Sequence, residues 1–172
     1  MTMKPIEARF ALGSEQDLTV PTSTQKYPLG FVYECEDSNT KTIQKFMYVY
    51  GGSGLTANLP YMISYTSTTA QEIKPITPAT FGDPGKIICV PQVAIASTYY
   101  GFVQIQGYCE AAIAASITAG YYLSVENSAT TFTSDETTTP SNETVAVAID
   151  ATTGAATGTI YLNGRKAIIA AS

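Results

Sequence analysis

Residues 99–125, YYGFVQIQGYCEAAIAASITAGYYLSV, most constrain what this chain can fold into. Aromatic and branched residues typical of a strand come first, small residues follow, and a second strand pattern begins after Gly120. This order predicts a strand that ends at Gly107, a crossover of small residues and a second strand. The alanine-rich segment 109–116 is the best helix candidate of the chain, and a short turn or an extended crossover fits it equally well.

Further strand patterns occur along the chain, separated by glycine and proline. Residues 30–37 alternate, with Phe31, Tyr33 and Cys35 on one face, and residues 42–51 read as the returning strand of a hairpin. GGSG at 51–54 is interpreted as a flexible break. Further strands are predicted at 59–68, at 87–97, where Pro91 indicates a kink or two short strands, at 144–151 and at 159–169.

Composition supports the same fold class, because only 13% of the residues are charged and Thr, Ser, Ala and Gly replace the missing charges. We predict a mainly β protein, a small antiparallel β-barrel or β-sandwich with little helix. Residues 26–172 form its single β-rich domain, and residues 1–25 an irregular N-terminal arm. Apolar residues recur in this arm, so it should pack either on its own domain or on a neighbouring subunit.

The sequence of 172 residues contains no histidine, which excludes Ser-His-Asp and Cys-His nucleophile systems and most zinc sites. The three cysteines, Cys35, Cys89 and Cys109, form no CxxC motif and are expected to be buried free thiols. Glu34 and Glu36 could pair as acid and base, but such a pair is more often a solvated strand face. We therefore expect no catalytic, cofactor-binding or metal-binding residues, and no enzymatic activity.

Charge and hydropathy argue against nucleic-acid and membrane partners. The net charge is −5 and the nine Lys and Arg residues are scattered, whereas a nucleic-acid interface needs a basic stripe. The N-terminal MTMKPIEARF lacks the apolar core of a signal peptide. The longest run of small apolar residues, 111–120, is too short to span a bilayer.

Twelve tyrosines and no tryptophan make tyrosine the main candidate for recognition. A tyrosine side chain combines a large apolar body with a polar tip, which suits the core, a subunit interface or a platform for sugars. Five tyrosines gather around the 99–125 stretch. The candidate residues for a subunit or capsid interface are Phe10, Leu12, Leu18, Val20, Tyr99, Tyr100, Tyr121 and Tyr122.

The segment YYGFVQIQGYCEAAIAASITAGYYLSVENSATTF, followed after a loop by NETVAVAIDATTGAATGTIYLNG, resembles the C-terminal module of head decoration (cement) proteins of tailed bacteriophages. The resemblance covers about residues 95–165. It rests on an aromatic strand that ends in Gly, an Ala-Gly before the next strand, a late VAVAI strand and a short YL-G strand. The first 90 residues carry no such resemblance.

This resemblance implies a non-catalytic virion structural protein on the capsid exterior, assembled in the host cytoplasm. It implies a homo-oligomer, often a trimer, that binds the major capsid protein and stabilises the head. The alternative function is a receptor- or carbohydrate-binding module of a phage fibre or capsid surface, suggested by the tyrosines and the Thr/Ser-rich loop at 127–144. The sequence leaves open the host, the oligomer number and the capsid-contacting residues.

Overall fold

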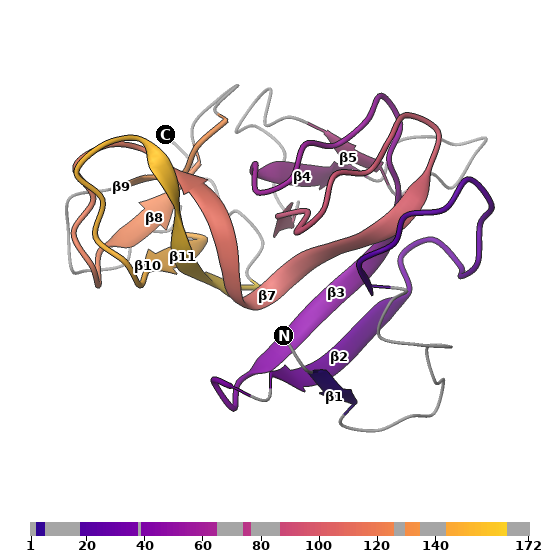
Figure 1. Cartoon of the computed structure of the whole chain (residues 1–172), viewed down its shortest axis with the longest axis horizontal. Coiled ribbons are helices and arrows are strands. Elements are labelled where there is room, and N and C mark those ends of the chain that lie inside the picture. The colour runs from indigo at the N-terminus through magenta and orange to yellow at the C-terminus, as the bar shows by residue number, and fades with distance from the viewer. Residues whose placement is uncertain are drawn as a thin grey trace, which may run out of the picture.

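The computed structural model describes residues 3–5, 18–37, 39–64, 74–76, 87–125, 130–134 and 144–164, with the backbone alone at 3–5, 64 and 74–76. These residues form two antiparallel sheets and no α-helix (Figure 1). No described helix is long and apolar enough to cross a membrane. The predicted mainly β, antiparallel fold is confirmed.

The larger sheet has eight strands in the order β1-β2-β3-β7-β11-β10-β8-β9. Their bounds are β1 Met3–Pro5, β2 Val32–Asp37, β3 Ile43–Tyr50, β7 Tyr100–Ile113, β11 Ala156–Asn163, β10 Ala146–Ala148, β8 Tyr122–Ser124 and β9 Thr133–Ser134. The smaller sheet has the order β5-β4-β6, with bounds β5 Lys74–Ile76, β4 Tyr61–Ser64 and β6 Ile88–Cys89. The larger sheet has two ends over the described residues and packs against the smaller one, so the sandwich alternative fits.

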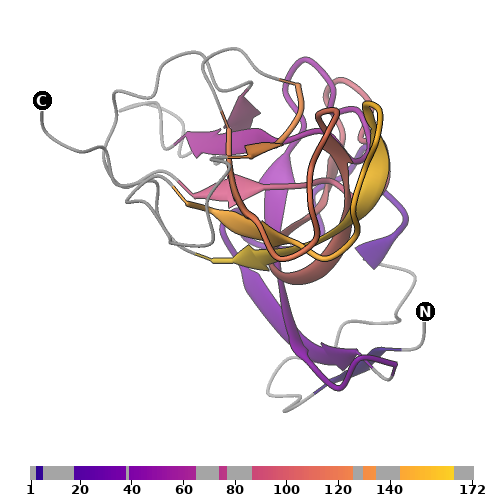
Figure 2. The same cartoon turned by 90° about the vertical axis from the view of Figure 1, so that its left-hand side faces the viewer.

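The predicted hairpin is confirmed by β2 and β3, whose register places Glu34 opposite Lys45. Alternation decides its two faces, since Tyr33 and Cys35 are buried whereas Glu34 is exposed. Asp37 organises the connecting loop, where its carboxylate accepts hydrogen bonds from the backbone N–H of Asn39 and the hydroxyl of Thr40, both at 2.9 Å. We call the three strands β1, β2 and β3 the ribbon; it projects away from the rest of the sheet (Figures 1 and 2).

The predicted strand end at Gly107 is wrong, because β7 continues through this glycine for six more residues to Ile113. Its first half pairs with β3 and its second half with β11. Ala111 and Ile113 are fully buried in this second half. Pairing and burial therefore override the helix propensity of the alanine-rich segment, and residues 109–113 are strand.

A bulge allows β7 to serve both halves of the sheet. Lys45 pairs with Gln106 but the next residue, Phe46, pairs with Gln104, so β7 carries one extra residue there. Gly107 follows with φ +98°, and a Cβ atom on it would lie 2.8 Å from the carbonyl oxygen of Ile43. Only glycine fits this combination of positive φ and close backbone approach.

Two buried glutamines satisfy the backbone at this bend. The Nε2 of Gln104 donates to the carbonyl of Tyr108 at 2.8 Å, and the Nε2 of Gln44 donates to the same oxygen at 3.3 Å. Both side chains are almost completely buried, with exposed fractions of 2% and 0%. The amides thus replace ladder bonds that the bulge removes, which a buried carbonyl requires.

Each half of β7 has one edge without a strand of the larger sheet, opposite β3 in the first half and opposite β11 in the second, and loops cover both edges. Tyr100 exchanges backbone hydrogen bonds with Thr22, and Gln104 exchanges them with Val90. Further along, the side-chain amide of Gln92 bonds both the N–H and the carbonyl of Glu110, each at 3.2 Å. A single side chain here takes the place of a neighbouring strand.

Three apolar clusters surround β7. One fills the space between the β7–β11–β10–β8 region and the smaller sheet, the second lies between β3–β7 and β4–β6, and the third, mostly aromatic, lies on the other face of β2, β3 and β7. Tyr61 and Ile63 of β4 belong to the second cluster whereas Met62 belongs to the first. Successive side chains of β4 point to opposite faces, so this strand contributes to both clusters.

Other predictions need correction. GGSG at 51–54 is a packed turn, because Gly51 is buried and its N–H donates to the carbonyl of Tyr99 at 2.7 Å. Residues 87–97 form the short strand β6 and a separate bridge at Ile95, as the two-strand alternative predicts. The irregular N-terminal arm contains the strand Met3–Pro5. The division at residue 25 stays a prediction.

Burial protects all three cysteines, as predicted, and each is a free thiol. Burial raises the pKa of the Cys89 and Cys109 thiols far above the ordinary value, and the carboxylate of Glu110 adds to the shift at Cys109. The thiolate is the reactive form. Both groups therefore stay protonated and inert over the physiological pH range.

We predict that Gly107→Ala lowers the free energy of unfolding by about 3 kcal/mol, since it adds both strain and a backbone clash. Gly120→Ala is the matched control, because Gly120 has φ +86° but no atom within 4 Å of an added Cβ. The control should cost about 1–2 kcal/mol from positive φ alone. Urea unfolding measures both, and equal losses would show that the close approach at Gly107 contributes nothing.

We also predict that the thiols of the folded protein react with a disulfide reagent at pH 8 at least about tenfold more slowly than those of the unfolded chain. In denaturant all three thiols should titrate. Absorbance of the released thiolate follows the reaction. A thiol that reacts at the unfolded rate in the native protein would contradict the burial described above.

Candidate interaction surfaces

The N-terminal interface candidates divide between core and surface. Leu18 is buried in the aromatic cluster with Tyr48 and Phe102. Val20, two residues later, is the most exposed large apolar residue among those described, with 53% of its surface accessible. The chain then pairs through Thr22 with β7. Phe10 and Leu12 lie outside the described residues.

Tyr99 lies on a tightly held corner next to this segment. Its carbonyl accepts the Gly51 N–H, and its own N–H donates to Ala96 at 3.1 Å. A Cβ on Gly51 would lie 2.8 Å from a methyl carbon of Ile95, so the GGSG turn and residues 95–99 pack without spare space. Tyr99 as a whole is 37% exposed. The corner thus presents an aromatic side chain on a fixed backbone.

Backbone strain occurs at the same corner. Thr98 has φ +67°, a conformation that is a genuine outlier for a β-branched residue. Its N–H donates to the carbonyl of Gly52 at 3.2 Å, and the hydroxyl of Ser97 donates to the same oxygen at 3.0 Å. Strained loops of this kind concentrate at binding sites. We call Thr98 and Tyr99 the corner surface. Val20 is separate from it, because the antiparallel bridge between Thr22 and Tyr100 places Val20 toward Phe102.

The remaining tyrosine candidates are separate from this surface. Tyr100 is half-buried and its ring stacks with that of Tyr48, with centroids 6.3 Å apart. Tyr122 begins β8 and Tyr121 directly precedes it, and both residues are half-buried. In the larger sheet β8 is separated from β7 by β11 and β10. The structure therefore does not gather the tyrosines into one platform for a sugar. Most of the Thr/Ser-rich loop lies outside the described residues.

A second surface, which the sequence interpretation missed, lies on the ribbon. Val32 and Ile43 are 40% and 45% exposed, and the register of the hairpin places both on the face that carries Glu34 and Lys45. Lys45 Nζ lies 2.6 Å from Glu34 Oε1. We call these four residues the ribbon face. A signal was present in the sequence, because Val32 lies on the strand face opposite the apolar Tyr33 and Cys35.

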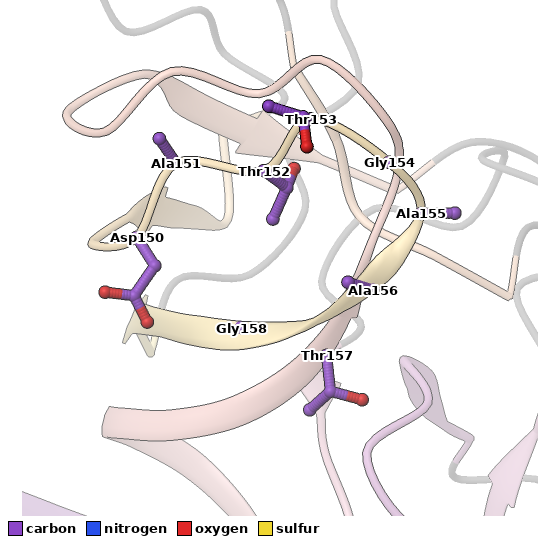
Figure 3. Close-up of a pocket in the computed structure, with 9 residues that line it drawn as sticks. All are labelled: Asp150, Ala151, Thr152, Thr153, Gly154, Ala155, Ala156, Thr157 and Gly158. Carbon is purple, nitrogen blue, oxygen red and sulfur yellow. The ribbon is translucent and has the colours of Figure 1, made fainter.

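A shallow concavity of about 300 Å³ lies within the loop that joins β10 to β11 (Figure 3). It is lined by residues 150–158, mostly Ala, Thr and Gly. Thr159, through its side chain and its backbone N–H, lowers the pKa of the Asp150 carboxyl. Asp150 is the one ionisable side chain of this lining, so the concavity has no second group with which to perform acid–base chemistry.

The two carboxylates weighed as an acid–base pair have different neighbours. Glu34 is held by Lys45, and Glu36 lies opposite Ile43 in the hairpin register. No group of three His, Cys, Asp or Glu side chains suited to a metal ion occurs in the parts of the chain that the structure describes.

Comparison with known proteins identifies no family. No family model matches the sequence, and no curated protein matches it. Among solved structures, the head fiber gp8.5 N base of bacteriophage phi29 is similar, with a TM-score of 0.49 and 13% sequence identity, over 70% of this chain and 95% of that chain. A likeness of this size carries no argument about function.

We predict that Thr98→Asn raises the free energy of unfolding by about 1 kcal/mol, because asparagine tolerates a positive φ that threonine does not. Ser116→Asn is the control, since Ser116 has φ +64° on an exposed turn but no β-branch. Its gain should be smaller. Urea unfolding compares the two, and an unchanged or lower stability of Thr98→Asn would show that the corner stores no strain.

Proposed function

We propose that this protein is a structural component of a bacteriophage virion that decorates the outside of the head, binds the major capsid protein and stabilises the shell. It acts as a homo-oligomer, with a trimer favoured, and performs no chemistry. The carrying observation is that the segment resembling head decoration proteins, residues 95–165, coincides with one continuous part of the larger sheet.

This segment contains β7, β8, β9, β10 and β11, which are hydrogen-bonded neighbours in the order β7-β11-β10-β8-β9. One of the three apolar clusters draws twelve of its members from the same segment, among them Ile113, Leu123, Phe132 and Ile160. A pattern of residue types that spans a structural unit with its own core is stronger support than one scattered over several units.

The corner surface supplies a contact suited to such a role. Tyr99 offers exposed aromatic area, and the packed GGSG turn holds it in place. Val20 adds a separate exposed apolar residue. Contacts that are already ordered before binding lose little conformational entropy on association. Binding through rigid apolar area needs no titratable group, which agrees with a chain that has no histidine and only 13% charged residues.

The test is binding of the purified protein to expanded capsids that lack it, measured by co-sedimentation, together with light scattering of the free protein. We expect saturable binding and a discrete oligomer. A monomer that does not bind such capsids would overturn the proposal.

Matched variants locate the contact. Tyr99→Ala and Val20→Ser should each weaken capsid binding at least about tenfold, as expected for truncation of a central anchor. Ile149→Ser is the control, because Ile149 is also 37% exposed but lies between β10 and β11, in the other half of the sheet. Equal weakening by all three would assign the capsid contact elsewhere.

A further inference from the structure

The strand β1 adds to an edge that would otherwise be bare. It pairs antiparallel with β2 in the register Met3 with Asp37, Lys4 with Glu36 and Pro5 with Cys35. Among the described strands its neighbour is β2, since β1 ends the larger sheet. Unpaired strand edges attract other chains, and an extended segment that covers one uses main-chain hydrogen bonds.

The length of the connection that follows β1 sets how far this strand can reach. Leu18, where the described chain resumes, belongs to the same apolar cluster as Cys35, the register partner of Pro5. Twelve residues, 6–17, join Pro5 to Leu18. A chain of that length reaches up to roughly 40 Å when extended. The covalent link therefore allows β1 to reach the ribbon of a neighbouring copy as well as its own.

The ribbon face gives a reason for two ribbons to meet. The smaller sheet covers Met47 of β3 but leaves Ile43 and Val32 exposed on the same face. Glu34 and Lys45 between them offer one charge of each sign. A face of this kind can contact a neighbouring copy, because its lysine can meet a glutamate of that copy while the apolar residues leave water.

The register of β1 adds a further charge match. It sets Lys4 opposite Glu36, so residues of opposite charge are cross-strand neighbours. The same three residue pairs form whether β1 comes from the same chain or from another copy. Exchange of an identical element is thus a route to an oligomer that loses no native pairing.

We propose that in the assembled oligomer the N-terminal strand Met3–Pro5 of one copy pairs with β2 of a neighbouring copy, with the ribbon faces in contact. The inference rests on the homo-oligomer of the proposed function but not on capsid binding. It assigns the ribbon to contacts between copies and leaves the corner surface, at the opposite end of β3, for another partner.

Disulfide cross-linking tests this pairing in the full-length chain. Directly opposite residues of antiparallel strands have Cα atoms about 4.5–5.5 Å apart, within the range that a disulfide bridges. In Lys4→Cys/Glu36→Cys, mild oxidation should convert most of the protein into covalent oligomers on non-reducing gels. The three native thiols are buried and should not form disulfides. The single variant Lys4→Cys is the control for cross-links that involve a native thiol.

A mixing experiment makes the result specific. Lys4→Cys and Glu36→Cys chains, one of them carrying a size tag, are unfolded together, refolded and oxidised. A covalent heterodimer is expected only if the strand is exchanged. An exclusively intramolecular disulfide in the double variant, or no disulfide in either experiment, would overturn the proposal. Cross-linked oligomers that fail to bind capsids would instead count against the decoration role alone.

A second set of variants tests the ribbon face. Val32→Ser/Ile43→Ser should shift the oligomer toward monomer by at least about tenfold in dissociation constant, measured by sedimentation equilibrium. The exposed Ile149 provides the control as Ile149→Ser, which should leave the oligomer unchanged. An unchanged oligomer in the double variant, with a folded far-ultraviolet spectrum, would remove the ribbon face from the interface.

Discussion

The bend of β7 at Gly107 is the constraint on which the rest of the structure depends. A 14-residue strand pairs with β3 before the bend and with β11 after it, so one strand organises both halves of the larger sheet. The bend requires a residue without a Cβ, because Ile43 approaches through its carbonyl oxygen. It also requires polar side chains inside the core, since the displaced carbonyl of Tyr108 is satisfied by Gln44 and Gln104. A small set of residues thus decides the architecture.

The bend also explains where interaction surfaces can exist. Before Gly107, β3 and β7 are packed on both faces, by the smaller sheet and by the aromatic cluster, so apolar residues there are hidden. Only the two ends of this layer are left uncovered. One is the ribbon, which extends past the smaller sheet, and the other is the corner at Tyr99. Val32, Ile43 and Tyr99 are therefore exposed where the packing of layers stops.

Most of the fold could be predicted from sequence, because alternation and turn residues determine it locally. The β2–β3 hairpin follows from a period-two pattern alone. The buried cysteines follow from their odd number and the absence of a CxxC motif. The continuation of β7 past Gly107 could not be predicted, since alanines 111 and 112 favour a helix in isolation and become strand only when β11 pairs with them. The corner surface was half predicted. Tyr99 was a candidate, but the hydrogen bond from the Gly51 N–H to its carbonyl, which fixes the corner, is a long-range contact.

The two surfaces suit different kinds of contact. The corner is held by short backbone hydrogen bonds and glycine contacts, so it can offer area without losing freedom on binding. The ribbon differs, because three residue pairs hold β1, which a long connection joins to the rest of the chain. An exchange of β1 between copies therefore loses no residue pair. The proposed role, self-association followed by attachment to a larger shell, uses both kinds of contact. An exchangeable strand makes self-association depend on concentration, whereas a rigid corner reduces the conformational entropy lost at the second contact.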